Sequence, residues 1–252
     1  METITSIDQL ESLLKVKAVI EDTCFDELEW DESLYDLSFS NCQFILVSFT
    51  GIDFENINFT NCEFRNCTFD SAKFDSCVFQ KCKFYDGEKE TGCSFKFASF
   101  PGTVISQSDL SMCNLSRSNL YRIEVNQSQA TGIDCSYVTS SQNIGSSVTL
   151  NSARFSDCNL AYADFTGATL CEAELPENRF SHAIFNAANL EGALLTDCEL
   201  HGLEARDVVI KGADLRGSQI SGLDIRDIDM ADVKINSYQQ QVLLETIGIV
   251  ID

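Results

Sequence analysis

The chain has 252 residues, of which 39 are acidic and 17 basic, so its formal net charge is −22 at pH 7. A surface this acidic repels nucleic acid and attracts proteins that present positive charge, so we expect no direct binding of nucleic acid. The apolar runs are far too short to span a bilayer, and the sequence does not open with the charged and apolar regions of a signal peptide. These features predict a soluble, cytoplasmic protein without membrane contact.

Residues 1–19 follow no clear period, and we expect them to form an N-terminal cap with Ser6–Lys15 as a short helix or an extended segment. A repeat array needs such a cap because its end otherwise presents an open edge. A loose period of five then begins, and its first large side chains are Ile20, Phe25, Trp30 and Tyr35. From Tyr35 to Phe39 the spacing drops by one residue.

Phenylalanine then recurs at every fifth position without interruption, at Phe39, Phe44, Phe49, Phe54, Phe59, Phe64, Phe69, Phe74, Phe79 and Phe84. In a flat strand, residues five apart point to opposite faces, so they could not all be buried. A helix would spread every fifth side chain around its circumference. The chain must therefore turn a corner once per repeat.

A small residue stands two positions before most of these large centres, and the other three positions of each repeat are polar. Two inward positions per repeat, with a right-angled corner between repeats, give four repeats per coil. Coils that stack at the spacing of strands in a sheet would make about eleven coils and a rod roughly 50 Å long. The repeats span 20–235, since large centres continue from Phe95 to Ile235.

Two stretches depart from the pattern, 85–94 and 136–149. The first gains one residue of register and predicts a small bulge or loop that holds Tyr85, Asp86, Gly87, Glu88, Lys89 and Glu90. The second keeps the register but has Ser140 and Gly145 at core positions, which predicts an underpacked or kinked side of the solenoid. Each departure is either a partner contact or a tolerated bulge.

Residues 236–252 abandon the period of five for a helical one. Asn236 or Ser237 is the expected N-cap, Gly248 the expected stop, and Ile249 begins an expected short strand. An ending this apolar must fold over the last coil or meet a partner.

Twelve cysteines are present, and nine of them occupy the small inward position of a repeat. We interpret these nine as core filler that a reducing cytosol keeps as thiols. Their spacing is the repeat period and not that of a zinc site, so we expect no metal. The two histidines, His182 and His201, stand at outward positions, and no phosphate loop or nucleophile motif is present. The sequence predicts a protein without catalytic activity or cofactor.

The segments AYADFTGATLCEAEL, NAANLEGALL and KGADLRGSQI closely resemble the repeat A(D/N)Lxx of the pentapeptide-repeat family. The resemblance implies an all-β fold, a right-handed quadrilateral β-helix, followed here by a short C-terminal helix. In the quinolone-resistance branch of that family a similar terminal helix joins two subunits tail to tail. Carried over to this chain, the resemblance implies a homodimer through Tyr238, Val242, Leu243, Leu244, Ile247 and Ile249.

The same resemblance implies a DNA mimic that binds DNA gyrase or topoisomerase IV and protects it from quinolones or other gyrase poisons. The charge density fits this role, about one negative charge per 2 to 2.5 Å of rod against one per about 1.7 Å in duplex DNA. We expect one outward column of acids, with two more beside it, to imitate phosphates: Glu124, Asp164, Glu204 and Asp224, then Asp207 and Asp227.

Members that protect gyrase carry longer projecting loops, whereas only the modest stretch 85–94 is evident in this sequence. The alternative function is a pentapeptide-repeat scaffold for protein–protein interaction or regulation. A continuous acidic stripe along the surface would favour mimicry, and a patchy surface would favour the scaffold.

Overall fold

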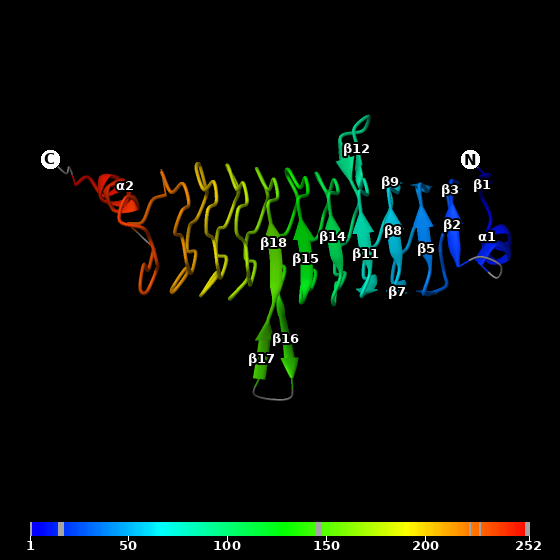
Figure 1. The fold of residues 1–252 in the computed structure, drawn as a ribbon, viewed down its shortest axis with the longest axis horizontal. Helices are drawn as coiled ribbons and strands as arrows, with labels where there is room; N and C mark the ends of the chain where they lie inside the picture. Colours follow the sequence, from blue (N-terminus) through cyan, green and yellow to red (C-terminus); the bar gives the residue numbers. More distant parts are fainter. Residues whose placement is uncertain (1, 15–17, 145–147, 222, 227, 250–252) are drawn as a thin grey trace.

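The protein, described from a computed structural model, is a rod of stacked coils with short helices at its two ends (Figure 1). The structure describes residues 2–14, 18–144, 148–221, 223–226 and 228–249. Each coil has four sides, and equivalent sides of successive coils pair in parallel to form four faces. The four-sided solenoid that the repeat pattern predicts, and the right-handed quadrilateral β-helix that the family resemblance implies, are confirmed.

Three faces begin as sheets of short parallel strands. Face 1 contains β1 (Glu2–Ile4), β3 (Thr23–Asp26), β6 (Gln43–Ile45) and β9 (Glu63–Arg65). Face 3 contains β4 (Leu34–Tyr35), β7 (Asp53–Glu55) and β10 (Lys73–Asp75). Face 4, in front in Figure 1, contains β2 (Val19–Glu21), β5 (Ser38–Ser40), β8 (Asn58–Thr60), β11 (Val78–Gln80), β14 (Val104–Ser106), β15 (Ile123–Asn126) and β18 (Ala153–Ser156).

Face 2 lies between faces 1 and 3, opposite face 4. Single parallel bridges link its coils through Glu29, Ser48, Thr68, Ser94, Asn114, Asp134, Asp164, Ile184 and Glu204. Similar bridges extend the other three faces toward the C-terminus, for example from Asp214 to Lys234 on face 4.

Aromatic rings fill the interior of the first half of the rod. Rings from successive coils lie parallel, as for Phe59 and Phe79, whose centroids are 4.8 Å apart with planes 4° apart. Neighbouring rings within one coil meet edge to face, as for Phe59 and Phe64 at 5.4 Å. Both geometries are favourable, each worth about 0.5 to 1.5 kcal/mol beyond the area that is buried. Packed aromatic side chains therefore form the core at this end.

The nine inward cysteines are all buried, as the pattern predicts: Cys42, Cys62, Cys67, Cys77, Cys82, Cys93, Cys113, Cys158 and Cys198. Their thiols donate hydrogen bonds to backbone carbonyls of neighbouring strands, for example from Cys77 Sγ to the carbonyl oxygen of Phe54 at 3.4 Å. Burial raises the pKa of the Cys77 thiol to about 12, so the group stays protonated and unreactive at neutral pH.

The corners are tight turns whose third residue has a left-handed backbone. At one corner the N–H of Ile52 donates to the carbonyl of Phe49, and Gly51 between them has φ +74°. This is the type II turn, which favours Gly or Asn at that position because other side chains are strained there. Asn41, Asn61 and Asn66 stand at such corners, each with φ of 53°.

The first turn of the array differs from the sequence prediction at one side. Leu34, and not Tyr35, is the inward centre: Leu34 is buried and pairs with Phe54, while Tyr35 is half exposed. The missing residue therefore lies between Trp30 and Leu34, and the period of five is already regular from Leu34 to Phe39. Assigning the centre to the larger side chain caused the error.

Two hairpins project from the rod at diagonally opposite corners (Figure 1). One consists of β12 (Tyr85–Asp86) and β13 (Thr91–Gly92) at the corner between faces 1 and 2. The other consists of β16 (Ser141–Ile144) and β17 (Val148–Asn151) at the corner between faces 3 and 4. The prediction of a kinked or underpacked side at 136–149 is wrong, because Ser140 is buried and the chain then leaves the core as a hairpin. Gly145 lies outside the described residues.

The second hairpin escaped the sequence pattern because of its length. Glu124 pairs with Arg154 on the next coil, thirty residues away, where the regular separation is twenty. The insertion therefore adds ten residues, which is two whole repeats, and the period resumes in phase after it.

Helices occupy both ends of the rod. Helix α1 (Ile7–Leu14) follows β1, and its Ile7, Leu13 and Leu14 pack against the core. Helix α2 (Gln239–Thr246) follows the last coil. Neither described helix has the length and apolar character that crossing a bilayer requires.

The N-cap of α2 differs from the expected one. Tyr238 is at the cap position, without a side-chain cap, and Asn236 and Ser237 lie before it. Instead, Gln239 Oε1 accepts the N–H of Asn236, and Gln239 Nε2 donates to the carbonyls of Leu215 and Ser218 at 2.8 Å each. Gly248, with φ +84°, ends the helix as predicted. Of the expected strand after it, residues 250–252 lie outside the described residues.

Some corner glycines are required by space as well as by backbone conformation, which a pair of substitutions can test. A Cβ at Gly202 would lie 2.5 Å from Nδ1 of His182, whereas a Cβ at Gly51 would have no atom within 4 Å. Both residues have positive φ. We expect Gly51→Ala to cost about 1 to 2 kcal/mol of unfolding free energy, and Gly202→Ala to cost about 1 kcal/mol more because the imidazole must move. Denaturant unfolding of both variants measures this difference, and equal losses would contradict the collision.

Candidate functional site

The predicted column of acids is split between opposite faces. Asp164 and Glu204 lie on face 2, in one ladder with Ile184 between them. Glu124 lies on face 4, where it pairs with Val104 and Arg154. Placing Glu124 in that column is wrong, because the ten inserted residues shift its position by two sides of the coil. Sequence reasoning missed Asp134, which does occupy the face 2 ladder beside Asp164.

Three of the predicted acids, Glu204 among them, lie at the C-terminal end of face 2. The bridges of face 2 stop at Glu204 and those of face 3 at Val209, so the last coil is separated from the coil before it on this side. An open cleft of about 630 Å³ results, and Glu204, Asp207 and Asp224 all line it. Its apolar lining is Leu203, Ala205, Leu223 and Ile228. Asp227 lies outside the described residues.

The acids of the face 2 ladder have a structural hydrogen bond that does not require charge. Oδ1 of Asp164 accepts the N–H of Thr166 at 2.8 Å, and Oδ1 of Asp134 accepts the N–H of Ser136 at 2.9 Å. Asn114 makes the same bond to the N–H of Ser116 at 2.9 Å. Asp and Asn are therefore equivalent for this turn bond. The second oxygen of Asp134 also accepts Nδ2 of Asn114 on the coil before, at 2.9 Å.

Most ion pairs lie on the other faces. The described pairs include Glu63–Arg65 and Glu199–Arg179 on face 1, Asp75–Lys73 on face 3, and Glu174–Arg154 and Asp214–Arg216 on face 4. On face 2, Arg226 pairs with Asp224, and the hydrogen bonds from its side chain lower the pKa of that carboxyl to about 2. Among the described residues no cation forms an ion pair with Asp134, Asp164 or Glu204, so the charge of these three carboxylates is not neutralised by a described cation.

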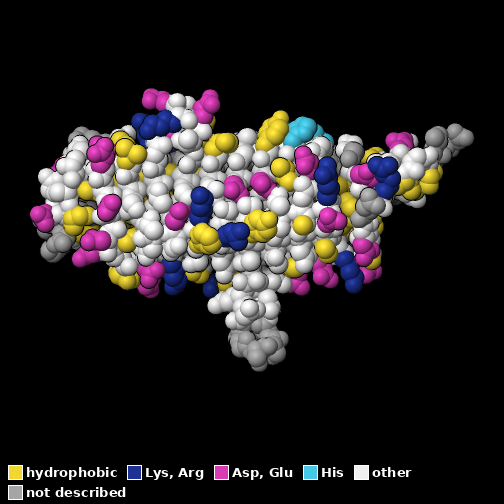
Figure 2. Space-filling view, turned by 180° about the vertical axis from the view of Figure 1, so that it is seen from behind, with side chains coloured by type: hydrophobic (Ala, Val, Ile, Leu, Met, Phe, Trp, Pro, Cys, Tyr) yellow, Lys and Arg dark blue, Asp and Glu magenta, His cyan; other side chains and the backbone are white. Residues whose placement is uncertain are grey.

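Charge on the surface is patchy. Figure 2 looks at the side opposite Figure 1, and shows acidic, basic and hydrophobic side chains interspersed along the rod. In the ladder of face 2, Ile184 separates Asp164 from Glu204. One protomer thus carries no continuous acidic stripe on this face.

The predicted loop at 85–90 is a hairpin held by one of its own acids. Oδ1 of Asp86 accepts the N–H groups of Glu88 and Lys89 at 3.0 and 3.4 Å, and its Oδ2 accepts Nδ2 of Asn66 at 2.9 Å. The hydrogen bond from Asn66, followed by those from the backbone, lowers the pKa of Asp86. Asp86 is buried, so it stabilises the turn, whereas Gly87, Glu88, Lys89 and Glu90 are exposed and Tyr85 is half buried.

The residues of the predicted dimer interface differ in exposure. Leu243 is buried against the last coil, and Val242 and Leu244 are half buried. Tyr238, Ile247 and Ile249 are exposed, the first to 64%. The helix is therefore anchored on its own rod by Leu243 and Gln239 and presents the other three apolar side chains outward.

The described residues include no group of three or more His, Cys, Asp or Glu side chains that could hold a metal ion. The rings of His182 and His201 are 5.6 Å apart, and Ser181 Oγ lies 3.4 Å from both His201 Nδ1 and Glu199 Oε2. In this group Glu199 contacts the serine and not the imidazole, so it does not orient a general base as a catalytic triad does.

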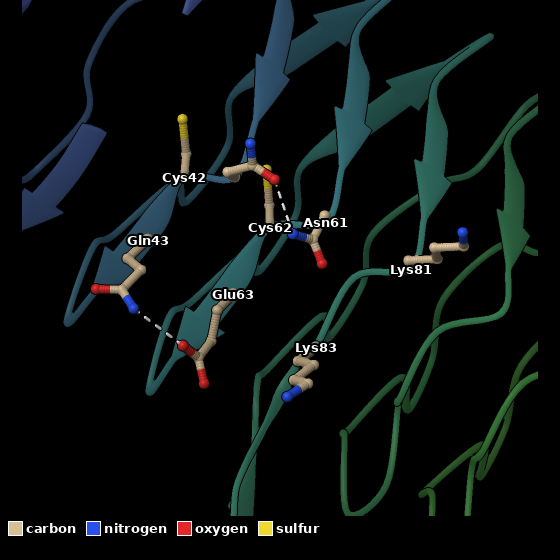
Figure 3. Close-up of a pocket in the computed structure, with 8 residues that line it drawn as sticks. Cys42, Gln43, Asn61, Cys62, Glu63, Lys81 and Lys83 are labelled. Carbon is tan, nitrogen blue, oxygen red and sulfur yellow. Dashed lines mark hydrogen bonds between the residues drawn. The ribbon is translucent and has the colours of Figure 1, made fainter. Parts of the chain in front are cut away.

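The cavity in Figure 3 is a polar depression of about 210 Å³ at the edge of face 1. Its side chains bond to each other along the rod: Gln43 Nε2 donates to Glu63 Oε2 at 3.3 Å, and Asn61 Nδ2 donates to Asn41 Oδ1 at 2.7 Å. Lys81 and Lys83 line it from the next coil. These ladders between coils are structural. Cys42 and Cys62 also line the cavity, and both thiols donate to backbone carbonyls of their own coil and the coil before.

Comparison with known proteins agrees with the geometry. A model of the family of pentapeptide repeats matches eight copies in this chain, over residues 42–80, 149–177 and 179–212. These three segments match the pentapeptide-repeat family, and the chain resembles the quinolone-resistance branch of that family.

The resemblance is to Qnr proteins in both sequence and structure. Pentapeptide repeat protein QnrB4 of Escherichia coli and quinolone resistance pentapeptide repeat protein QnrB96 of Scandinavium goeteborgense are each 32% identical over 96 residues. That segment is 38% of this chain and 45% of each relative, so the alignment spans less than half of either protein.

Structures of QnrB1, a plasmid-mediated fluoroquinolone resistance protein, match more completely. A trypsin-treated variant has a TM-score of 0.67 at 28% identity, over 91% of this chain and 98% of that one. The full-length protein has a TM-score of 0.65 at 29% identity, over 87% and 99%.

The main test of the site concerns the charge of face 2. Asp164→Asn retains an oxygen for the N–H of Thr166, so we expect its unfolding free energy to stay within about 0.5 kcal/mol of the natural chain. Asp164→Ala removes the acceptor and should cost about 1 kcal/mol. Thermal or denaturant unfolding of both variants measures this. If Asn destabilises as much as Ala, the charge itself has a structural role.

Proposed function

We propose that the protein is a DNA-mimicking rod that binds a type II topoisomerase, DNA gyrase or topoisomerase IV, in the groove that holds DNA. It does so as a homodimer, without catalysis or cofactor, and protects the enzyme from quinolones or other poisons. The similarity to QnrB1 along nearly the whole of both chains is the observation that carries this proposal. The net charge of −22 supports it, since a positively charged groove attracts such a rod over long range.

The exposed apolar side chains at the C-terminal end support dimerisation. Tyr238, Ile247 and Ile249 project from the end of the rod and are unpaired in the protomer. Joining two such ends would bury them and would double the length of the rod, to roughly 100 Å, comparable to about thirty base pairs of DNA at 3.4 Å each.

The hairpin at 141–151 supports a protective role. The sequence alone offered no long projection, whereas the structure has two, and β16–β17 extends well beyond the rod (Figure 1). Projecting loops are the feature that the resemblance links with protection.

A scaffold for protein–protein interaction is the second candidate, and the patchy charge of the surface favours it. Carboxylates in ion pairs, such as Asp214 with Arg216, imitate phosphates poorly. A scaffold of this kind would need no topoisomerase.

Supercoiling of plasmid DNA by purified gyrase distinguishes the two functions. We expect the natural chain to inhibit supercoiling at micromolar concentration in low salt and to lose potency as salt rises, because charge attraction is screened. It should also reduce DNA cleavage by gyrase in the presence of a fluoroquinolone. No effect at low salt, with gyrase or with topoisomerase IV, would leave the scaffold as the better account.

The charge of face 2 can be removed in the same assay. Asp134→Asn with Asp164→Asn keeps the turn hydrogen bonds, though it removes the acceptor for Nδ2 of Asn114, and should weaken inhibition about tenfold. As a matched control, Asp214→Asn with Arg216→Gln removes an ion pair on face 4 without changing the net charge and should leave inhibition unaltered. If the face 2 variant and the face 4 control change inhibition equally, inhibition does not depend on the carboxylates of face 2.

Deleting the second hairpin tests protection separately from binding. Removing residues 142–151 restores the five-residue spacing between Ser140 and Phe155, and the segment contains no charged residue. We expect the unfolding temperature to fall by no more than about 4 °C and inhibition of supercoiling to persist, while relief from fluoroquinolone is lost. Full relief by the shortened chain would exclude the hairpin from protection.

A further inference from the structure

Among the described left-handed corner residues, large exposed hydrophobic side chains occur at only two of the four corners of the rod; Tyr35, also exposed, stands one position before the left-handed Asp36 at the corner between faces 3 and 4. Leu46, Met112 and Tyr162 lie on the corner between faces 1 and 2, and Phe97 and Tyr137 on the corner between faces 2 and 3. The corner between faces 4 and 1 has polar residues and a glycine instead: Asp22, Asn41, Asn61, Lys81, Gln107, Gln127, Asp157, Glu177, Asp197 and Gly217. The hydrophobic corners are thus the two that border face 2.

The fold does not require these side chains. Phe97, Met112, Tyr137 and Tyr162 have φ between 56° and 60°, a left-handed conformation that is a true outlier for bulky residues. Gly and Asn fit the same position better, and they occupy it at Gly51, Asn61 and many other corners. Strained and exposed aromatic residues of this kind indicate a function outside the fold.

Three of the four are aromatic, and two of these rings are held in place by their neighbours. Arg117 lies over the ring of Tyr137 at 5.0 Å, and the ring covers Gly167, where a Cβ would be 2.7 Å from it. The ring of Tyr162 stacks on His182 with centroids 5.2 Å apart and planes 14° apart. Tyr137 and Tyr162 nevertheless remain 51% and 62% exposed, and Phe97 is 59% exposed. Rings fixed in this way lose little freedom on binding.

The face between the two rows carries Asp134 and Asp164, which form no described ion pair. The surface therefore combines two carboxylates outside described ion pairs with rigid aromatic side chains, and the exposed cations Lys96 and Arg117 lie beside the rings at the corner between faces 2 and 3. Aromatic side chains dominate the binding energy of protein interfaces, and the carboxylates select a partner with positive charge. Nucleic acid does not fit, because a chain of net charge −22 repels it.

We propose that face 2 between the levels of Phe97 and Tyr162 is the surface that docks on the basic protein groove, with Phe97, Tyr137 and Tyr162 as its hot spots. This inference rests on the proposed function, and assigns the topoisomerase contact to one face of the rod. The carboxylates attract the partner at long range, and the three rings provide the part of the affinity that salt does not screen.

A triple variant tests the assignment. Phe97→Asn, Tyr137→Asn and Tyr162→Asn together relieve the left-handed strain, so the unfolding temperature should stay the same or rise. Binding to immobilised gyrase, measured at 50 and 300 mM salt, should weaken at least about tenfold at both concentrations, as for the loss of hot-spot residues. The matched control, Gln107→Asn with Gln127→Asn, makes the same kind of change between faces 4 and 1 and should bind as the natural chain does.

Each outcome decides between the two proposals. Unchanged binding by the triple variant overturns the assignment of face 2 and leaves the proposed function standing. No binding by the natural chain at 50 mM salt overturns both. If the triple variant unfolds early, Phe97→Gly alone, at a corner where glycine is favoured, replaces it, and it must weaken binding more than the control does.

Discussion

The stacking of each coil on the next is the interaction on which the whole molecule depends. Aromatic rings lie parallel between coils at distances such as 4.8 Å for Phe59 and Phe79, and backbone groups pair at the same time, as when the N–H of Asn58 donates to the carbonyl of Leu37 at 3.0 Å. Because side chains fill the interior, it has no room for a ligand in its aromatic half. In that half of the rod any function must therefore reside on the outer surface, at the corners or at the end.

Much of the outer surface is nevertheless occupied by structural tasks. The Asp or Asn before each centre accepts a backbone N–H, as Asp164 and Asn114 both do. Corner residues bond to their equivalents on the next coil, as Asn61 does to Asn41. Only the choices that the fold leaves open carry information about a partner: a charge where Asn would suffice, or an aromatic ring where Gly would fit better.

The period of five was sufficient to predict the fold, because every repeat must bury the same two positions. The same regularity concealed the errors. An insertion of ten residues between Ser140 and Ser152 is a multiple of the period, so it left the spacing of centres in phase and yet moved Glu124 to the face opposite Asp164. Placing residues twenty apart on the same face assumes that every five-residue repeat forms one side of a coil. The two repeats in the hairpin do not. Leu34 was missed for a related reason, since size alone favoured its neighbour Tyr35.

The sequence therefore predicted a column of outward acids but not which residues form it. The exposed aromatic residues at the corners were not predicted. Exposed corner positions follow no hydrophobic period, and the strain at Tyr137 or Phe97 is a property of φ that becomes visible only once the turns are known. The sequence did contain a signal for such a residue, which is a glycine at the equivalent corner one coil later. Gly167 accommodates the ring of Tyr137 in this way.

A rod with charge on all four faces attracts a positive groove but does not determine which face enters it. Screening confines such forces to about 8 Å at physiological salt, so short-range contacts must fix the rotation about the long axis. In DNA the helical grooves give a bound protein a defined rotation about the long axis. A straight-sided solenoid has no such grooves. The two hairpins, the open cleft at Glu204 and the aromatic corners make the four faces differ from one another. They are therefore the features that can give this acidic rod a single orientation on a protein.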